Sequence, residues 1–175
     1  MKHVVLVGMM GVGKSTIGRL VAEKLQRPFI DSDVQIEQAE GKPISEIFAD
    51  KGEAYFRQCE LETIRRIVND SAPVVLSIGG GAFISPVVRF LLKETATTFY
   101  LQARVETLVQ RVGSGATRPL LTQGTNGQVP LETRLRTLLQ EREPIYTQAN
   151  YIIETEELTA AQAAEAITGY RSVFA

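Results

Sequence analysis

The stretch GMMGVGKS, Gly8 to Ser15, decides the fold of this chain of 175 residues. It matches the phosphate-binding loop pattern G-x-x-x-x-G-K-[ST] at every position. The run HVVLV before it is typical of a strand, and STIGRLVAEKL after it is typical of an amphipathic helix. A glycine-rich turn with a chance lysine is the alternative interpretation. Because this loop binds phosphate in the strand–loop–helix context, the sequence predicts a nucleotide-binding site here.

The chemistry of such a loop gives its residues distinct roles. Glycines let backbone N–H groups turn toward phosphate oxygens, which a side chain would block. We expect Lys14 to reach the β- and γ-phosphates of ATP and Ser15 to offer its hydroxyl to Mg²⁺. The expected ATP-binding residues of the loop are Gly11, Val12, Gly13, Lys14, Ser15 and Thr16.

Beyond the loop, strand-like runs alternate with helical patterns along the whole chain. Strands are expected at residues 4–7, 28–30, 74–78, 98–101 and 151–153. Helices are expected at residues 17–25, 44–50, 53–68, 85–93, 105–111, 131–146 and 159–170, with a break at Gly52. This alternation predicts an α/β protein with a parallel sheet covered on both faces. No repeat or boundary divides residues 1–175, so we expect a single domain.

Composition excludes several classes of function. The net charge of −1 and a pI near 5.9 argue against a nucleic-acid or anionic-membrane binder, which needs a basic excess. The single cysteine, Cys59, and single histidine, His3, exclude an intramolecular disulfide and argue against a histidine-centred catalytic or metal site. No apolar stretch approaches the roughly 18 residues of a membrane helix. We therefore expect a soluble, cytoplasmic protein that binds neither nucleic acid nor membrane.

Two acidic residues follow the second predicted strand, in FIDSDVQIE. If the strand continues, Asp31 and Asp33 face the same way. Ligands in parallel sheets bind beyond the C-terminal ends of the strands. Asp31 is then expected to contact Mg²⁺ through water, and Asp33 to accept a hydrogen bond from an attacking hydroxyl group. In the alternative interpretation Ser32 and Gln35 form a capping box for the next helix, with Asp33 complementing the helix dipole.

Six segments together resemble one family. GMMGVGKST, FIDSDVQIE, EAYFRQCE, SIGGGAF, TRPLL and EREPIY occur in this order and are similar to shikimate kinase. The resemblance implies a P-loop NTP hydrolase-like fold: a three-layer α/β/α domain with a five-stranded parallel sheet and a mobile lid, here at about residues 112–130. It also implies transfer of a phosphoryl group from ATP to shikimate, with Mg²⁺, on the route to chorismate and the aromatic amino acids.

The resemblance assigns the acceptor site and the phosphate-transfer residues. Ser77 takes the place of the aspartate that ends this strand in other P-loop enzymes, and is expected to bond a water on Mg²⁺. The implied shikimate-binding residues are Asp33, Arg57, Gly79, Gly80, Gly81 and Arg142, with both arginines on the carboxylate. Arg118 matches the lid arginine that closes over the transferring phosphate, and Arg111 the residue that stacks on adenine. The implied catalytic residues are Lys14, Asp33 and Arg118.

Each of these assignments has a structural alternative. Arg57 could pair with Glu53 or Glu60 on its own helix, and Arg142 with a neighbouring glutamate such as Glu141 or Glu143. The three glycines could form only a turn, Arg118 a solvated loop charge and Arg111 an exposed helix end. Cys59 is expected to pack rather than react, and Arg134 and Arg136 are expected to be surface charges.

Two rival functions stay open at this stage. A kinase for another small polyol acid, such as gluconate, shares the loop, although the arginine pair and the glycine run favour shikimate. A catalytically silent homologue used for binding or regulation is the second, but Lys14, Ser15, Asp31, Asp33 and Arg118 are all intact. We expect the active protein to be a monomer.

Overall fold

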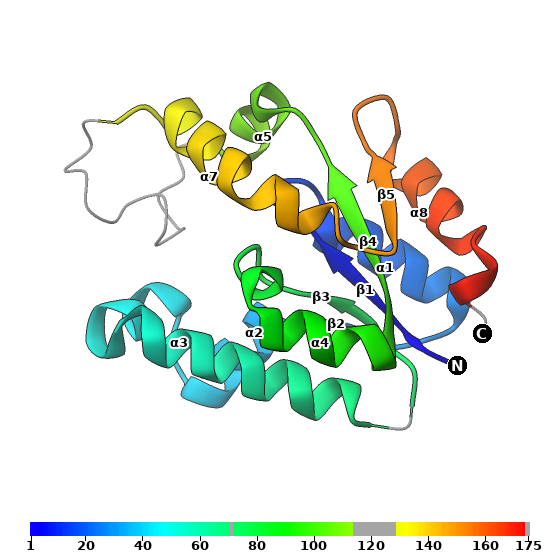
Figure 1. The fold of residues 1–175 in the computed structure, drawn as a ribbon, viewed down its shortest axis with the longest axis horizontal. Helices are drawn as coiled ribbons and strands as arrows, with labels where there is room; N and C mark the ends of the chain where they lie inside the picture. The colour runs from blue at the N-terminus through cyan, green and yellow to red at the C-terminus, as the bar shows by residue number, and fades with distance from the viewer. Residues whose placement is uncertain (71, 114–128, 174–175) are drawn as a thin grey trace.

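The computed structural model describes residues 1–70, 72–113 and 129–173. Its sheet has five parallel strands in the order β2-β3-β1-β4-β5 (Figure 1). The strands are β1 His3–Val7, β2 Phe29–Asp31, β3 Val75–Ser77, β4 Ala96–Gln102 and β5 Tyr151–Glu154. The predicted fold class is confirmed, and every strand overlaps its predicted position. The predicted lid is largely within residues 114–128, outside the described residues.

Helices cover both faces of the sheet. They are α1 Lys14–Leu25, α2 Ser32–Glu40, α3 Ile44–Val68, α4 Pro86–Thr95, α5 Val105–Val112, α7 Leu131–Tyr146 and α8 Ala160–Thr168, with short 3₁₀ turns η1 Ala82–Ile84 and η2 Arg171–Val173. Helices α1 and α8 pack together, while α4 packs on β4 and α3 on α4. The connection from β1 to β2 runs in one direction across the sheet, and the connection from β3 to β4 runs in the opposite direction. Because such connections are right-handed, the helices that they contain, α1 and α4, lie on opposite faces of the sheet.

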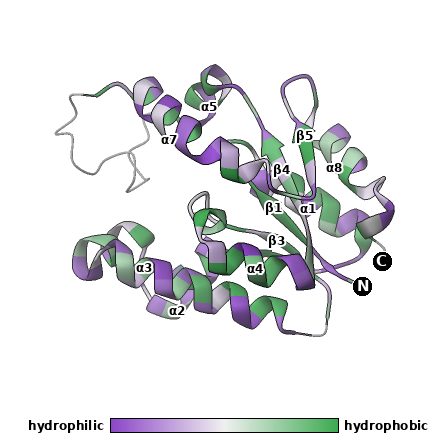
Figure 2. Cartoon of the chain, in the orientation of Figure 1, coloured by the Kyte–Doolittle hydropathy of each residue, from purple (hydrophilic) through white to green (hydrophobic). Residues whose placement is uncertain are grey.

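The centre of the sheet is buried from solvent. All five residues of β1 are buried, and β3 and β4 flank it on either side. Figure 2 shows hydrophobic residues along β4 and β5 and mixed surfaces on the helices, which is the pattern of helices that cover a sheet with one face. No helix in the described ranges is long and apolar enough to cross a membrane.

Helices α2 and α3 form a small unit beside the sheet with a core of its own. Ile36 of α2 packs with Ile47, Phe48 and Phe56 of α3, and the two phenylalanine rings are 4.8 Å apart. Gly52 interrupts α3 with φ 79° and ψ 173°, so the predicted break is confirmed. From this unit, Phe48, Phe56, Arg57 and Glu60 face the C-terminal ends of the strands, where they line a cavity.

The second strand ends at Asp31, one residue beyond its predicted end at residue 30. Because α2 begins at Ser32, the strand does not continue to Asp33, and strand alternation does not make the two aspartates face the same way. In the alternative interpretation the capping box is wrong, because the N-cap is Asp31, whose Oδ1 accepts the backbone N–H of Asp33 at 3.1 Å, but Asp33 does lie in the first turn of α2. Ser32 has another partner: its Oγ accepts the N–H of Gly79 at 3.2 Å. The cap therefore fixes the two aspartates relative to each other.

Candidate active site

A cavity of about 760 Å³ lies beyond the C-terminal ends of β1, β2 and β3. It contains the predicted phosphate loop on one side and the predicted acceptor residues on the other. The predicted residues that line it are Gly11, Gly13, Lys14, Ser15, Thr16, Asp31, Asp33, Arg57, Ser77, Gly79, Gly80, Gly81, Arg111 and Arg142. Val12 is predicted to bind ATP, but its side chain is buried at 1% exposure and lies outside the lining.

The phosphate loop is held in place by close backbone packing. Gly8 has φ +141°, and a Cβ there would lie 2.6 Å from the Leu101 carbonyl oxygen, so no other residue fits. Gly13, with φ 104°, is the N-cap of α1, which directs the positive end of that helix at the cavity. The Lys14 ammonium donates to the carbonyls of Gly8 at 2.9 Å and Met9 at 3.0 Å, across the mouth of the loop.

Arg111 reaches the same loop from α5. Its Nη1 donates to the Val12 carbonyl oxygen at 3.1 Å. The loop and helix touch closely, because a Cβ on Gly11 would lie 2.6 Å from Val112 Cγ2. The alternative of an exposed helix end is confirmed, because Arg111 is exposed in the last turn of α5, and the same side chain also lies against the loop and lines the cavity.

Oxygen ligands suited to Mg²⁺ gather where β1, β2 and β3 end. Ser15 Oγ donates to Asp31 Oδ2 at 2.7 Å. Asp31 pairs in register with Ser77 on the neighbouring strand, and Ser77 is 2% exposed. The described residues contain no cluster of three or more His, Cys, Asp or Glu side chains that would hold a metal alone. One carboxylate with hydroxyl groups fits Mg²⁺, which keeps several waters and binds through one or two carboxylates plus substrate phosphates.

Arg57 on α3 lies at the opposite wall of the cavity, between two glutamates. Its Nη1 donates to Glu60 Oε2 at 2.8 Å, and its Nη2 donates to Glu53 Oε1 at 3.0 Å. The ion-pair alternative for Arg57 is thus confirmed, and the same side chain also lines the cavity. Ion pairing and acceptor binding are compatible roles for Arg57, because the two glutamates on its own helix orient the guanidinium while it lines the cavity.

Glu60 is a site residue that the sequence indicated only as a partner of Arg57. It is 2% exposed, and among the described residues its Oε1 has no hydrogen-bond partner. Burial raises its pKa from 4.5 to about 7, which the neighbouring Arg57 opposes and Asp33 assists. Its spacing of three residues from Arg57 on one helix was the available signal, but nothing in the sequence predicts that this carboxyl is buried in the cavity.

The three consecutive glycines make room for these charged groups. A Cβ on Gly79 would lie 2.5 Å from Glu60 Oε1 and 2.9 Å from Asp33 Oδ1. One on Gly81 would lie 2.5 Å from Arg57 Nη2. A Cβ on Gly80 would have more room, at 3.3 Å from the Gly8 carbonyl oxygen and 3.4 Å from Arg142 Nη1. The glycines are therefore more than a flexible turn, because the site side chains occupy the space of their missing side chains.

Arg142 comes from α7 and completes the acceptor wall. It is 8% exposed, and among the described residues its Nη1 has no hydrogen-bond partner. The predicted alternative pair with Glu143 does not form, because Glu143 accepts a hydrogen bond from Gln102 at 2.8 Å instead. Tyr146, one turn further on, donates its hydroxyl to the Gly80 carbonyl and is fully buried. A buried guanidinium nitrogen beside a glycine run is suited to an anionic ligand.

Some predicted residues lie elsewhere. Arg118 falls outside the described residues, as does most of the segment 122–130 that follows it. Arg136 forms exposed ion pairs with Glu132 at 2.8 Å and Glu106 at 3.1 Å, which confirms it as a surface charge. Cys59 is a free thiol packed against the α2–α3 core, as predicted.

Comparison with known proteins gives a consistent result. The family model described as shikimate kinase matches residues 10–170. The shikimate kinase of Cereibacter sphaeroides is 44% identical over 163 residues, which is 93% of this chain and 79% of that protein. The shikimate kinase of Novosphingobium aromaticivorans is 46% identical over 151 residues, 85% of this chain and 76% of that protein.

Solved structures extend the comparison to three dimensions. The shikimate kinase from Acinetobacter baumannii in complex with shikimate is 40% identical and superposes with a TM-score of 0.88, covering 96% of this chain and 91% of that one. A gluconokinase from Sinorhizobium meliloti 1021 covers 99% of this chain and 96% of its own at a TM-score of 0.60 and 20% identity. The second likeness concerns the fold alone.

Proposed function

The chain belongs to the shikimate kinase family, and we propose that it transfers the γ-phosphoryl group of ATP to the 3-hydroxyl of shikimate. The products are ADP and shikimate 3-phosphate, on the route to chorismate and the aromatic amino acids. The observation that carries this proposal is the single cavity with a phosphate loop on one side and Arg57 and Arg142 on the other. That arrangement suits a donor phosphate facing a small organic acid.

ATP occupies the loop side of the cavity in this proposal. The backbone from Gly11 to Thr16 surrounds its phosphates, and Lys14 turns from the loop carbonyls to the β- and γ-phosphates. Arg111, already against the loop, takes the adenine end. Ser15, Asp31 and Ser77 would hold Mg²⁺, as the family resemblance implies. When bound, it neutralises charge on the β- and γ-phosphate oxygens.

Shikimate occupies the other side, where two guanidinium groups meet the glycine run. Arg57 and Arg142 bind its carboxylate by charge-assisted hydrogen bonds, each worth about 1.5–3 kcal/mol. The glycines allow the ring to approach the backbone closely. Two cations on one wall favour an acid over a neutral polyol, which is why the acceptor is an acidic alcohol.

Transfer then depends on positioning. Asp33 accepts a hydrogen bond from the shikimate 3-hydroxyl and orients or deprotonates it. The hydroxyl oxygen bonds to the γ-phosphorus while the bond from phosphorus to the β–γ bridging oxygen breaks, and Lys14 offsets the charge on the departing ADP. Arg118, from the lid, is assigned to the transferring phosphoryl group.

A gluconate-type kinase is the alternative from the same class, and a silent binding protein is the alternative from another. The first is weakened because the gluconokinase shares only the fold at 20% identity. The second is weakened because Lys14, Ser15, Asp31 and Asp33 all line one cavity. We assign the reaction to a monomer, since the described part of one chain supplies both walls of the site. A cytoplasmic location is the other part of this assignment.

The decisive experiment measures ADP release with shikimate, gluconate, a nucleoside monophosphate or no acceptor. We expect release only with shikimate, and a phosphorylated acid as the second product. A higher kcat/KM with gluconate overturns the substrate assignment. Silence with every acceptor, together with retained ATP binding, supports the non-catalytic alternative.

A further inference from the structure

Two glycines lie at the turns of the α2–α3 unit, one at the end of α2 and one at the break in α3. Neither position is too crowded for a side chain. Gly41 ends α2 with φ 69°, and Gly52 interrupts α3 with φ 79°. A Cβ at either position would meet nothing within 4 Å. Only the backbone conformation therefore demands glycine at these two positions. Across the Gly52 break, the contact between Phe48 and Phe56 in the α2–α3 core joins residues 44–51 to residues 53–68.

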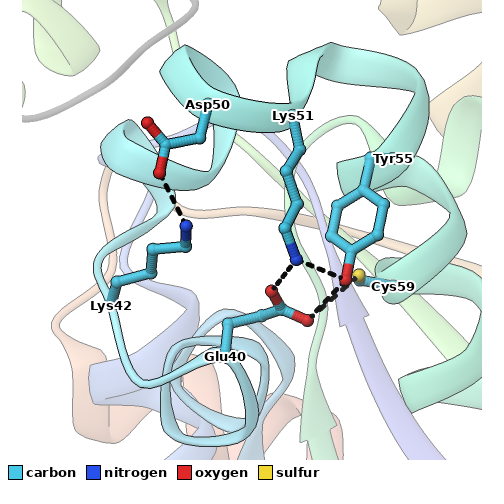
Figure 3. Close-up of polar contacts among 6 residues, drawn as sticks. All are labelled: Glu40, Lys42, Asp50, Lys51, Tyr55 and Cys59. Carbon is cyan, nitrogen blue, oxygen red and sulfur yellow. Dashed lines mark hydrogen bonds and ion pairs between the residues drawn. The ribbon is translucent and has the colours of Figure 1, made fainter.

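Three side chains span the Gly52 break in a closed triangle (Figure 3). Lys51, just before the break, donates to Glu40 Oε2 at 3.0 Å and to the Tyr55 hydroxyl at 2.9 Å. Tyr55, just after the break, donates to Glu40 Oε1 at 2.8 Å. We call Glu40, Lys51 and Tyr55 the brace. It joins the end of α2 to both segments of α3, so all three pieces are tied at one point.

A neighbouring ion pair connects only two of those pieces. Lys42 Nζ lies 2.7 Å from Asp50 Oδ2, joining the turn after α2 to the first segment of α3 (Figure 3). Both of its members precede Gly52, so this pair does not span the break. Like the Lys51–Glu40 pair, it is partly exposed and lies beside a glycine. It is a natural control for any effect of the brace.

The second segment of α3 carries the acceptor wall. Tyr55 is followed by Phe56, which packs in the α2–α3 core, and by Arg57 and Glu60, which line the cavity. Successive helical residues are about 100° apart, so Tyr55 and Arg57 point to opposite sides of one rigid turn. Any tilt of this segment about Gly52 moves the Arg57 guanidinium relative to Gly81, where it occupies the space that a Cβ would need.

We propose that the brace is a positioning element of the acceptor site: Glu40, Lys51 and Tyr55 lock the bend at Gly52 and so hold Arg57 in place for the acid. None of the three lines the cavity itself. The proposal rests on the assignment of Arg57 to the acceptor carboxylate. Hydrogen bonds from Lys51 and Tyr55 lower the pKa of Glu40, which keeps the carboxylate ionised and the triangle closed at neutral pH.

The test compares Tyr55→Phe and Lys51→Met with Lys42→Met in the full chain. Tyr55→Phe keeps the ring and removes only the hydroxyl, and all three changes lie at partly exposed side chains. We expect the two brace variants to raise the KM for shikimate roughly threefold to tenfold, with the KM for ATP unchanged. Lys42→Met is expected to leave both constants unchanged. Equal effects of all three variants would overturn the proposal, as would a lowered melting temperature without any change in KM.

Rescue by charge exchange gives a second readout. Glu40→Lys alone places two ammonium groups together and should raise the KM for shikimate, and adding Lys51→Glu should restore much of it. Failure of the double variant to recover, in a folded protein, counts against the brace.

Arg57→Lys, measured in parallel, separates this proposal from the site assignment. A raised KM for shikimate in Arg57→Lys with normal values in the brace variants overturns the brace alone. A normal KM in Arg57→Lys overturns the assignment of Arg57, and the brace proposal with it.

Discussion

The carboxylates of Asp33 and Glu60 flank the α-carbon of Gly79, each within 3 Å of the place where a Cβ would project: 2.9 Å for Asp33 Oδ1 and 2.5 Å for Glu60 Oε1. One acid comes from α2 and the other from α3, and the glycine lies just beyond β3. Helix α2, helix α3 and the turn after β3 thus meet at the α-carbon of Gly79. The two carboxylates can approach it because glycine has no methyl group there.

Gly79→Ala is therefore expected to damage the acceptor site. The added methyl displaces Glu60, Asp33 or both, and a shift of about 1 Å at a catalytic group can cost roughly 100-fold in rate. We expect kcat/KM for shikimate to fall by about this factor while ATP binding is retained. Gly169→Ala is the control, because its Cβ would meet its nearest neighbour at 3.4 Å on the far side of the protein. Normal kinetics in Gly79→Ala would contradict the close packing.

The buried Glu60 should make the stability of the protein depend on pH. Its pKa is about 7 in the folded chain against 4.5 for an exposed glutamate, so the folded state binds more protons between these values. Stability contributed by this group is then lost as pH rises through that window. We expect Glu60→Gln to remove this part of the slope, measured by urea unfolding at pH 5, 6, 7 and 8. Parallel pH profiles for the variant and the parent would show that Glu60 does not titrate this way.

Arg142 should set the affinity for the acid. Lysine lacks the planar fork that binds a carboxylate, and loss of a charge-assisted hydrogen bond costs about 1.5–3 kcal/mol, or roughly 10- to 100-fold. We expect Arg142→Lys to raise the KM for shikimate by that factor without changing the KM for ATP. Arg136→Lys on the same helix, where the arginine forms only exposed pairs, is expected to have no effect. Similar kinetics in both variants would exclude Arg142 from the acceptor site.

Asp33 should matter for turnover more than for nucleotide binding. In Asp33→Asn the side chain keeps its shape but loses its charge, so the attacking hydroxyl loses its charged acceptor and the group that takes up its proton. General acid–base groups typically contribute 10²–10⁴ in rate, and we expect kcat to fall by roughly 100-fold or more. ATP affinity, measured by calorimetry, should stay within about twofold of the parent. Near-normal turnover would remove Asp33 from the mechanism.

Much of the fold follows from local patterns in the sequence. The phosphate loop and its flanking strand and helix are contiguous, so spacing and hydrophobic period were sufficient to predict them. Gly52 was predicted as a break for the same reason. The end of β2 was predicted to within one residue, but the N-cap of α2 was placed at Ser32 instead of Asp31, because a strand pattern of three residues does not reveal which side chain accepts the Asp33 N–H.

The acceptor site was less accessible to sequence reasoning. Arg57 and Arg142 lie far apart in the chain, and only the resemblance to a family suggested that they act together. Glu60 was missed as a site residue because helix periodicity does not say which charged residues a distant glycine turn will bury. The pairing of Arg57 with Glu53 or Glu60 was predicted from helical spacing, and the structure adds that both pairs form at once.

The closeness of the Gly8 carbonyl to Gly80 bears on how the acceptor specificity of shikimate kinases can be changed. The donor loop and the acceptor loop leave adjacent strands, β1 and β3, so the span that the phosphoryl group must cross is dictated by the spacing of the sheet. Helices α3 and α7 bring the two arginines assigned to the acid, so their cavity-lining positions are the ones to vary, with Tyr146 kept because its hydroxyl holds the Gly80 carbonyl. Altering which alcohol is phosphorylated is then a separate problem from preserving the reaction, and directed evolution toward new acids can be confined to those two helices.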